Sequence, residues 1–95
     1  MSIQKGDIVR SAAGRDAGKL FYVLSTEDEY AAIANGRERR VEKPKRKKLK
    51  HLHYVGTCAD RVSDRLKNNE RVSNSELRKT LADFSSATGG VQGGM

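Results

Sequence analysis

The chain has 95 residues, of which 36% are hydrophobic and 33% are charged, with a formal net charge of +7. This length allows one small domain with a thin core, and no stretch approaches the roughly 20 apolar residues that a transmembrane helix requires. The N-terminus lacks the apolar segment of a secretory signal, and a single cysteine cannot form an internal disulfide, so we expect a cytoplasmic protein.

The first half of the chain begins with two predicted strands joined by a polar loop. Ile8 and Val9 form a first apolar run, and residues 20–24 form a second run rich in β-branched and aromatic side chains. Because the second run is apolar at successive positions, we expect both faces of its strand to be covered.

The loop between these runs contains two glycines, Gly14 and Gly18, each followed by a cation. Glycine tolerates positive φ angles and lets a phosphate approach the backbone closely. Arg15 and Lys19 should therefore project from a tight turn, where they can contact a phosphate. An ordinary β-turn, in which Asp16 bonds its own backbone, is the alternative interpretation.

A third strand is predicted over residues 30–34. The dipeptide Asn35-Gly36 that follows is the strongest short signal for a two-residue hairpin, because both residues tolerate positive φ. Residues 37–42 would then form the returning strand.

The turn length sets the predicted register of this hairpin. Tyr30 lies opposite Val41, and Ala32 lies opposite Arg39. Ile33 then faces the other way, so either it makes satellite contacts of its own or a bulge shifts the register.

Pro44 has no N–H for a β-ladder, so it should end the returning strand or confine it to an edge. Residues 45–50 are too densely charged to pack and must be solvated or bound to an anionic partner. The chain returns to the core as a closing strand at Leu49, Leu52, Tyr54 and Val55. Short strands joined by short turns predict a small curled barrel.

Apolar residues recur at helical spacing from residue 57 onward. Ala59, Val62 and Leu66 share one face of a first helix, with Thr57 and Asp60 as a possible capping pair, and Asn68-Asn69 ends it. Ser73 and Glu76 form a capping box for a second helix, whose apolar face contains Leu77, Leu81 and Phe84. From residue 85 the chain is rich in Ser, Thr and Gly, which predicts a disordered tail.

The positive charge is concentrated in seventeen residues. Residues 37–53 contain nine Lys or Arg and two Glu, a net charge of +7, whereas residues 1–36 sum to −1 and residues 54–95 to +1. Phosphates attract such a patch by Coulomb force and counterion release, so we favour a nucleic acid as partner. A solvated charged face, an anionic lipid and an acidic protein are the alternatives, but no amphipathic helix adjoins the run.

Other candidate sites are weak. His51, His53 and Cys58 lack a fourth ligand and match no zinc spacing, so we predict no metal and no cofactor. No carboxylate pair and no Ser/His or Cys/His arrangement indicates catalysis, so we predict a protein that is not an enzyme. The few aromatic residues are expected to serve mainly the core.

Two segments resemble a known family. Gly6-Asp7, Val9, Gly14 and Gly18-Lys19 before a hydrophobic strand resemble the KOW motif of ribosomal and transcription-elongation proteins. Residues 13–19, A-G-R-D-A-G-K, are most similar to the fourteen-e family of large-subunit ribosomal proteins, and residues 40–52 resemble its basic segment ending in K-H-L. The resemblance spans residues 6–52 and implies an SH3-like barrel that binds RNA on the ribosome; after His53 the chain departs from the family.

We therefore predict a mainly β protein: an SH3-like KOW barrel of five strands over residues 1–56, two short helices packed on it over residues 57–84, and a flexible tail over residues 85–95. The expected partners are ribosomal RNA of the large subunit and neighbouring ribosomal proteins, with no membrane association. A KOW-type transcription-elongation factor and a protein-interaction adaptor are the alternative functions. The predicted RNA-binding residues are Gly14, Arg15, Gly18, Lys19, Arg37, Arg39, Arg40, Lys43, Lys45, Arg46, Lys47, Lys48, Lys50 and His51.

Overall fold

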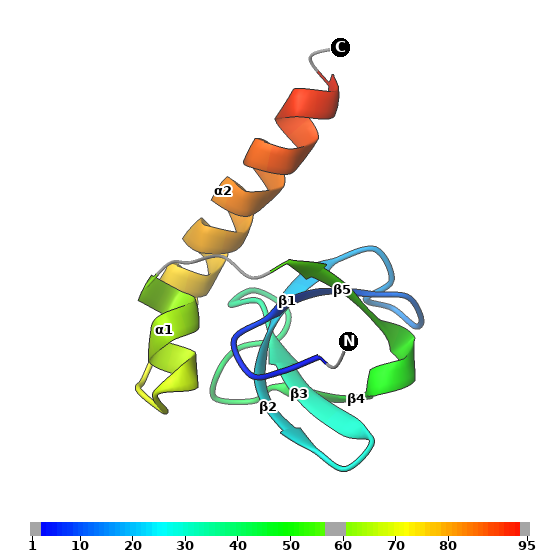
Figure 1. Ribbon diagram of the computed structural model, residues 1–95, viewed down its shortest axis with the longest axis vertical. Helices are drawn as coiled ribbons and strands as arrows, with labels where there is room; N and C mark the ends of the chain where they lie inside the picture. The colour runs from blue at the N-terminus through cyan, green and yellow to red at the C-terminus, as the bar shows by residue number, and fades with distance from the viewer. Residues whose placement is uncertain (1–2, 57–60, 94–95) are drawn as a thin grey trace.

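The computed structural model describes residues 3–56 and 61–93. Within these ranges, five strands form one antiparallel sheet in the order β4-β3-β2-β1-β5. The strands are β1 (Ile8–Ser11), β2 (Leu20–Glu27), β3 (Tyr30–Ala34), β4 (Lys45–Lys48) and β5 (Leu52–Gly56). A 3-10 helix, η1 (Leu49–His51), joins β4 to β5, and the helices α1 (Arg61–Lys67) and α2 (Asn74–Gly93) follow. The sheet curls without closing, and both helices lie on one side of it (Figure 1). The predicted mainly β class, with helices after the sheet, is confirmed.

The central strands are buried on both faces because their alternate residues belong to two apolar clusters. On one face, Ile8 and Tyr22 pack with helix residues that include Leu66 and Leu77. On the other face, inside the curl, the second cluster contains Val9, Phe21, Val23, Ala31, Ile33 and Leu52. Phe21, Tyr22 and Val23 are successive and fully buried, which confirms that β2 is covered on both sides.

The returning strand predicted at residues 37–42 is wrong. This segment is an irregular loop, and β4 pairs with β3 instead, so that Tyr30 lies opposite Lys48 and Ala32 opposite Arg46. Pro44 precedes the new strand rather than ending one. The charged β4 can be a strand because it lies at the edge of the sheet, where its side chains remain in water.

Ile33 lies in the main core and not in satellite contacts. It pairs with Val23 on β2 and with Lys45 on β4, and its side chain is fully buried. The register shift falls in β2, between Val23 and Ser25, where Leu24 is the extra residue. The predicted closing strand is present as β5, which pairs with β1 and includes the buried Leu52. Leu49 lies in η1 before this strand, and Tyr54 is exposed and does not join the core.

The helices pack largely as predicted. Val62 and Leu66 of α1 are buried, as are Leu77 and Leu81 of α2. Ser73 Oγ accepts a hydrogen bond from the Glu76 N–H at 3.1 Å, which forms one half of the predicted capping box. The predictions for Thr57, Cys58, Ala59 and Asp60 lie outside the described residues.

The second helix is longer than predicted. It has 20 residues and continues through residues 85–93, where the composition had predicted a flexible tail. Its final turns extend away from the sheet (Figure 1). In the described residues no helix combines the length and the apolar character needed to span a membrane.

Candidate nucleic-acid interface

The loop between β1 and β2 presents Arg15 to solvent. Gly14 and Gly18 bracket the turn with φ angles of 77° and 87°, which side chains with a Cβ adopt only with strain. The Gly18 N–H donates to Ser11 O at 2.7 Å and thereby closes the loop base. The Arg15 side chain is exposed and makes no hydrogen bond or ion pair with any residue that the structure describes. The loop can therefore offer this guanidinium to an external anion.

Asp16 ties this loop to the segment between β3 and β4. Its carboxylate is only 5% exposed and accepts hydrogen bonds from Arg39 Nε at 3.0 Å and Nη2 at 2.9 Å. The Arg39 side chain is 30% exposed. The alternative in which Asp16 caps its own backbone is therefore not the role of this side chain. Arg39, which we predicted to contact RNA, has its charge compensated within the protein.

The Asn35 side chain shapes the loop that replaces the predicted hairpin. Its Oδ1 accepts hydrogen bonds from the N–H groups of Arg37, at 2.9 Å, and Arg39, at 3.1 Å, while Nδ2 donates to Glu38 Oε1 at 3.1 Å. A side chain that binds backbone groups in this way competes with strand pairing. The segment after Asn35 consequently curls around that amide instead of returning along β3.

Two cations of β4 are held by the protein itself. Lys47 Nζ donates to the carbonyl of Ala13 at 2.7 Å, so this lysine bridges from the edge strand to the loop between β1 and β2. The Arg46 guanidinium lies over the ring of Tyr30, with its Cζ atom 4.0 Å from the ring centroid. A stacked guanidinium keeps its N–H edge available, so Arg46 remains able to bind a phosphate. Lys47 instead has a structural contact that the sequence did not indicate.

The remaining predicted cations fall into two groups. Lys19 pairs with Glu38, and Arg40 pairs with Glu42, each at 3.4 Å across exposed side chains. The side chains of six others are exposed and make no hydrogen bond or ion pair with the residues described by the structure: Arg15, Arg37, Lys43, Lys45, Lys48 and Lys50. His51 is half-buried, and its carbonyl accepts a hydrogen bond from the Ala12 N–H at 2.9 Å.

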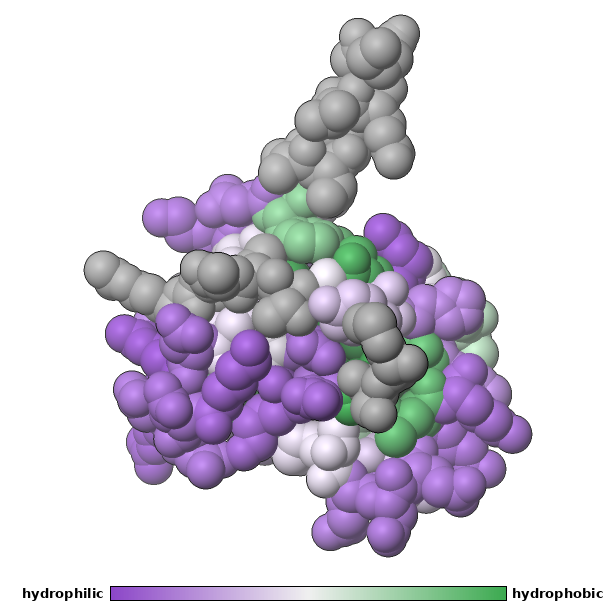
Figure 2. Space-filling model, in the orientation of Figure 1, coloured by the Kyte–Doolittle hydropathy of each residue, from purple (hydrophilic) through white to green (hydrophobic). Residues whose placement is uncertain are grey.

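Five cations without an acidic partner lie on β4 or next to it in the chain. We call Lys43, Lys45, Arg46, Lys48 and Lys50 the β4 surface; no acidic residue lies between the first and the last of them in the sequence. The segment that leads into β4 forms a hollow of about 770 Å³ lined in part by Lys43, Pro44 and Lys45. Figure 2 shows hydrophilic side chains over most of the visible sheet domain, with a hydrophobic area where α2 meets it.

Two glutamates in the loop between β3 and β4 have a pKa below the ordinary value. The hydrogen bond from Asn35, helped by the nearby Lys19 ammonium, lowers the pKa of Glu38 below its ordinary value of 4.5. The Asn74 side-chain amide donates to Glu42 Oε1 and lowers the pKa of that carboxyl in the same way. Both carboxylates are therefore negative at neutral pH and limit the net charge of residues 38–42.

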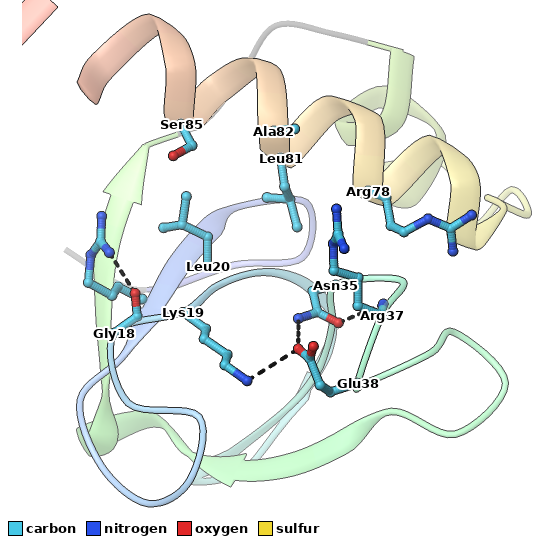
Figure 3. A pocket seen from close by; sticks show the side chains of 11 residues that line it. Gly18, Lys19, Leu20, Asn35, Arg37, Glu38, Arg78, Leu81, Ala82 and Ser85 are labelled. Carbon is cyan, nitrogen blue, oxygen red and sulfur yellow. Dashed lines mark hydrogen bonds and ion pairs between the residues drawn. The ribbon is translucent and has the colours of Figure 1, made fainter. Parts of the chain in front are cut away.

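A cleft of about 380 Å³ lies between the loops of the sheet and α2 (Figure 3). Its lining includes Arg10 of β1 and Arg78 of α2, which the sequence analysis did not select as site residues. The usable signal for Arg10 in the sequence was a cation directly after the apolar residues Ile8 and Val9. Arg78 follows Leu77 on an amphipathic helix, where a basic residue has no distinguishing pattern.

A comparison of the chain with family models found no match, and a comparison with curated proteins found no significant match. Functional inference therefore rests on the geometry and charge described above.

Proposed function

We propose that this protein binds structured RNA without catalysing a reaction, as a ribosomal or ribosome-associated protein of the cytoplasm. The proposed partner is ribosomal RNA of the large subunit, flanked by neighbouring ribosomal proteins. An SH3-like barrel of the KOW type is part of this proposal. A curled antiparallel sheet of five strands, with a glycine-bracketed loop between β1 and β2, supports it.

The observation on which the proposal rests is the β4 surface. Four of its five cations, the lysines, are exposed and have no acidic partner among the described residues, so binding an anion would break no ion pair there. The fifth, Arg46, lies over the ring of Tyr30 and has hydrogen-bond donors remaining. Successive side chains of this edge strand project from opposite faces of the sheet, so its charges flank the edge on both sides, where the backbone of a nucleic acid lying along the edge can reach them.

Arg15 supplies a second contact in this proposal. It lies on a different loop, and the Lys47 bridge to Ala13 holds that loop against β4. Two contacts from separate elements orient an RNA better than one charged strand, because rotation about the first contact is blocked. A planar guanidinium also recognises phosphate in a forked geometry that lysine cannot reproduce.

The salt dependence of binding tests this function. If the five cations of the β4 surface neutralise about five phosphates, log K should fall against log salt with a slope of roughly −3.5 to −4.5. Fluorescence anisotropy with labelled fragments of large-subunit ribosomal RNA measures this slope. An affinity that is indifferent to salt would refute RNA binding by this surface.

Two variants that lose the same number of charges distinguish binding by the β4 surface from binding that follows the net charge of the protein. The test variant is Lys45→Gln, Lys48→Gln and Lys50→Gln together, which leaves the internal contact of Lys47 intact. We expect its slope to weaken by about 2 to 2.7.

The control removes three exposed cations elsewhere, Lys67→Gln, Arg71→Gln and Lys79→Gln, and should change the slope little. Equal losses in both variants would mean that binding follows net charge and not the β4 surface. Nuclease-sensitive co-sedimentation with ribosomes then tests the ribosomal partner.

A further inference from the structure

Four cations from separate elements line the cleft beside α2. Arg10 comes from β1, Lys19 from the end of the loop before β2, Arg37 from the loop after β3, and Arg78 from α2. Glu38 is the acidic residue of the lining, so the lining cations exceed the lining acids by three. These residues contribute to the lining of a concave site of the size that binds small ligands.

Two of the guanidiniums are held in place before any ligand arrives. Arg10 Nη1 donates to Gly18 O at 2.7 Å, and Arg78 Nη1 donates to Gly36 O at 2.7 Å. Arg78 Nη2 also donates to Ser75 Oγ at 3.1 Å. Each guanidinium has five N–H donors, so these bonds leave others available. Holding the groups still in this way reduces the entropy lost when an anion binds.

Arg37 differs from these two arginines. Its backbone N–H donates to Asn35, but its side chain is exposed and makes no hydrogen bond or ion pair within the described part of the chain. The Asn35 amide therefore fixes the position of the Arg37 backbone, while the charge is left for an external group. Leu20 and Leu81 provide apolar lining beside the cations, which fits a ligand that joins a phosphate to a flatter, less polar part (Figure 3).

We propose that this cleft binds a nucleotide unit of the RNA, with the phosphate on Arg37 and Arg78, and that α2 is thereby part of the RNA-binding surface. This inference rests on the proposed RNA binding but concerns a site separate from the β4 surface. Arg10 and Arg78 then take part in RNA recognition, although neither is among the RNA-binding residues that the sequence analysis predicted. The helix is more than a cover for the apolar face of the sheet.

The test uses Arg37→Gln, because Arg37 has no described side-chain contact whose loss would disturb folding. The probe is a fluorescein-labelled hairpin of large-subunit ribosomal RNA, measured by anisotropy at several salt concentrations. We expect an affinity about three- to tenfold weaker and a salt slope reduced by about 0.7–0.9, as for the loss of one phosphate contact. Lys79→Gln is the matched control, since it removes one exposed cation of α2 that does not line the cleft.

A second variant should change the affinity for RNA in the opposite direction. Glu38→Gln removes the acid of the cleft and releases Lys19, while the glutamine Oε1 can still accept the bond from Asn35. We expect RNA affinity to rise about two- to fivefold, and Glu70→Gln, which removes an exposed acid outside the cleft, to change it less.

The outcomes separate this inference from the proposed function. If Arg37→Gln and Lys79→Gln behave alike while the triple variant of the β4 surface loses affinity, the cleft is not an RNA site, but the proposed function survives. If the β4 variant also binds normally, both fail. A free nucleotide is the other possible source of a phosphate, and titration of the isotope-labelled protein with AMP tests it. If AMP shifts the backbone NMR signals of Gly18 and Gly36 while Arg37→Gln leaves the affinity for RNA unchanged, the cleft binds a free nucleotide and the proposal is overturned.

Discussion

Two glycine-to-alanine substitutions would test whether α2 is held against the loop after β3. Gly36 has a φ of 78°, and a Cβ atom at this position would overlap the carbonyl of Asn74 at the start of α2. Gly18 has a similar φ of 87°, but a Cβ there would meet no atom within 4 Å. The two substitutions therefore share the backbone strain and differ in the clash with the helix.

The expected magnitudes follow from this difference. Placing alanine at positive φ costs about 1–2 kcal/mol, which is the whole expected loss for Gly18→Ala. Gly36→Ala adds an overpacking cost of about 1–3 kcal/mol, because the obstructing atoms include backbone and not only a flexible side chain. For a domain of this size, an extra 2 kcal/mol lowers the melting temperature by roughly 8–16 °C.

Thermal unfolding followed by circular dichroism measures both variants under one condition. The melting temperature of Gly36→Ala should lie well below that of Gly18→Ala. Equal melting temperatures would refute the packing of α2 on this loop. The cleft between them would then lose its structural basis.

Two further predictions concern the loops around β4. Asp16→Ala should lower the free energy of unfolding by about 1–3 kcal/mol, which is less than for a fully buried pair because the partner guanidinium is partly exposed. Urea denaturation in a double-mutant cycle with Arg39→Ala measures the coupling between the two side chains, and additive losses of stability would contradict it. The hydrogen bonds to Glu38 and Glu42 lower the pKa of each carboxyl, so the stability they contribute is present above pH 4.5 and is lost as the pH falls through the lowered values. Urea denaturation between neutral pH and about pH 3 should show that Glu42→Gln loses less stability on acidification than the unmodified protein. Identical acid sensitivity would mean that this carboxyl does not contribute to the pH dependence of stability.

The first three strands could be predicted because their residues are buried for reasons visible in the sequence. The run from Phe21 to Val23 is apolar at successive positions, and only a strand covered on both faces accommodates that pattern in a small β-domain. Gly14 and Gly18 likewise indicated where positive φ angles would occur. Local chemistry and tertiary structure agree in this half of the sheet.

The fourth strand could not be predicted by the same reasoning. Asn35-Gly36 is a hairpin signal, but Asn35 bonds the backbone of the following loop, and Gly36 contacts a helix about forty residues later in the chain. β4 itself consists of four cations, which no hydrophobic periodicity identifies as a strand. This strand forms because it pairs with β3 at the edge of the sheet, and that pairing is a property of the tertiary structure and not of the local sequence.

The candidate site shows the same limit. Composition located the positive charge, but it could not show which cations the protein compensates internally. Arg39 is paired with a buried carboxylate, and Lys47 bonds a carbonyl, whereas Lys45 and Lys48 are left for solvent or a ligand. Arg78 joins the cleft only because α2 docks beside the loop after β3.

The position of β4 at the edge of an open sheet has a consequence for self-association. An edge strand presents unpaired backbone groups to which a second copy of the chain could add, forming an intermolecular sheet. Lysine and arginine side chains along β4 oppose this, because two such edges repel each other. A polyanion bound there would cancel the repulsion while covering the same edge. The charges that attract a ligand would thus also disfavour pairing of two copies of the chain through this edge.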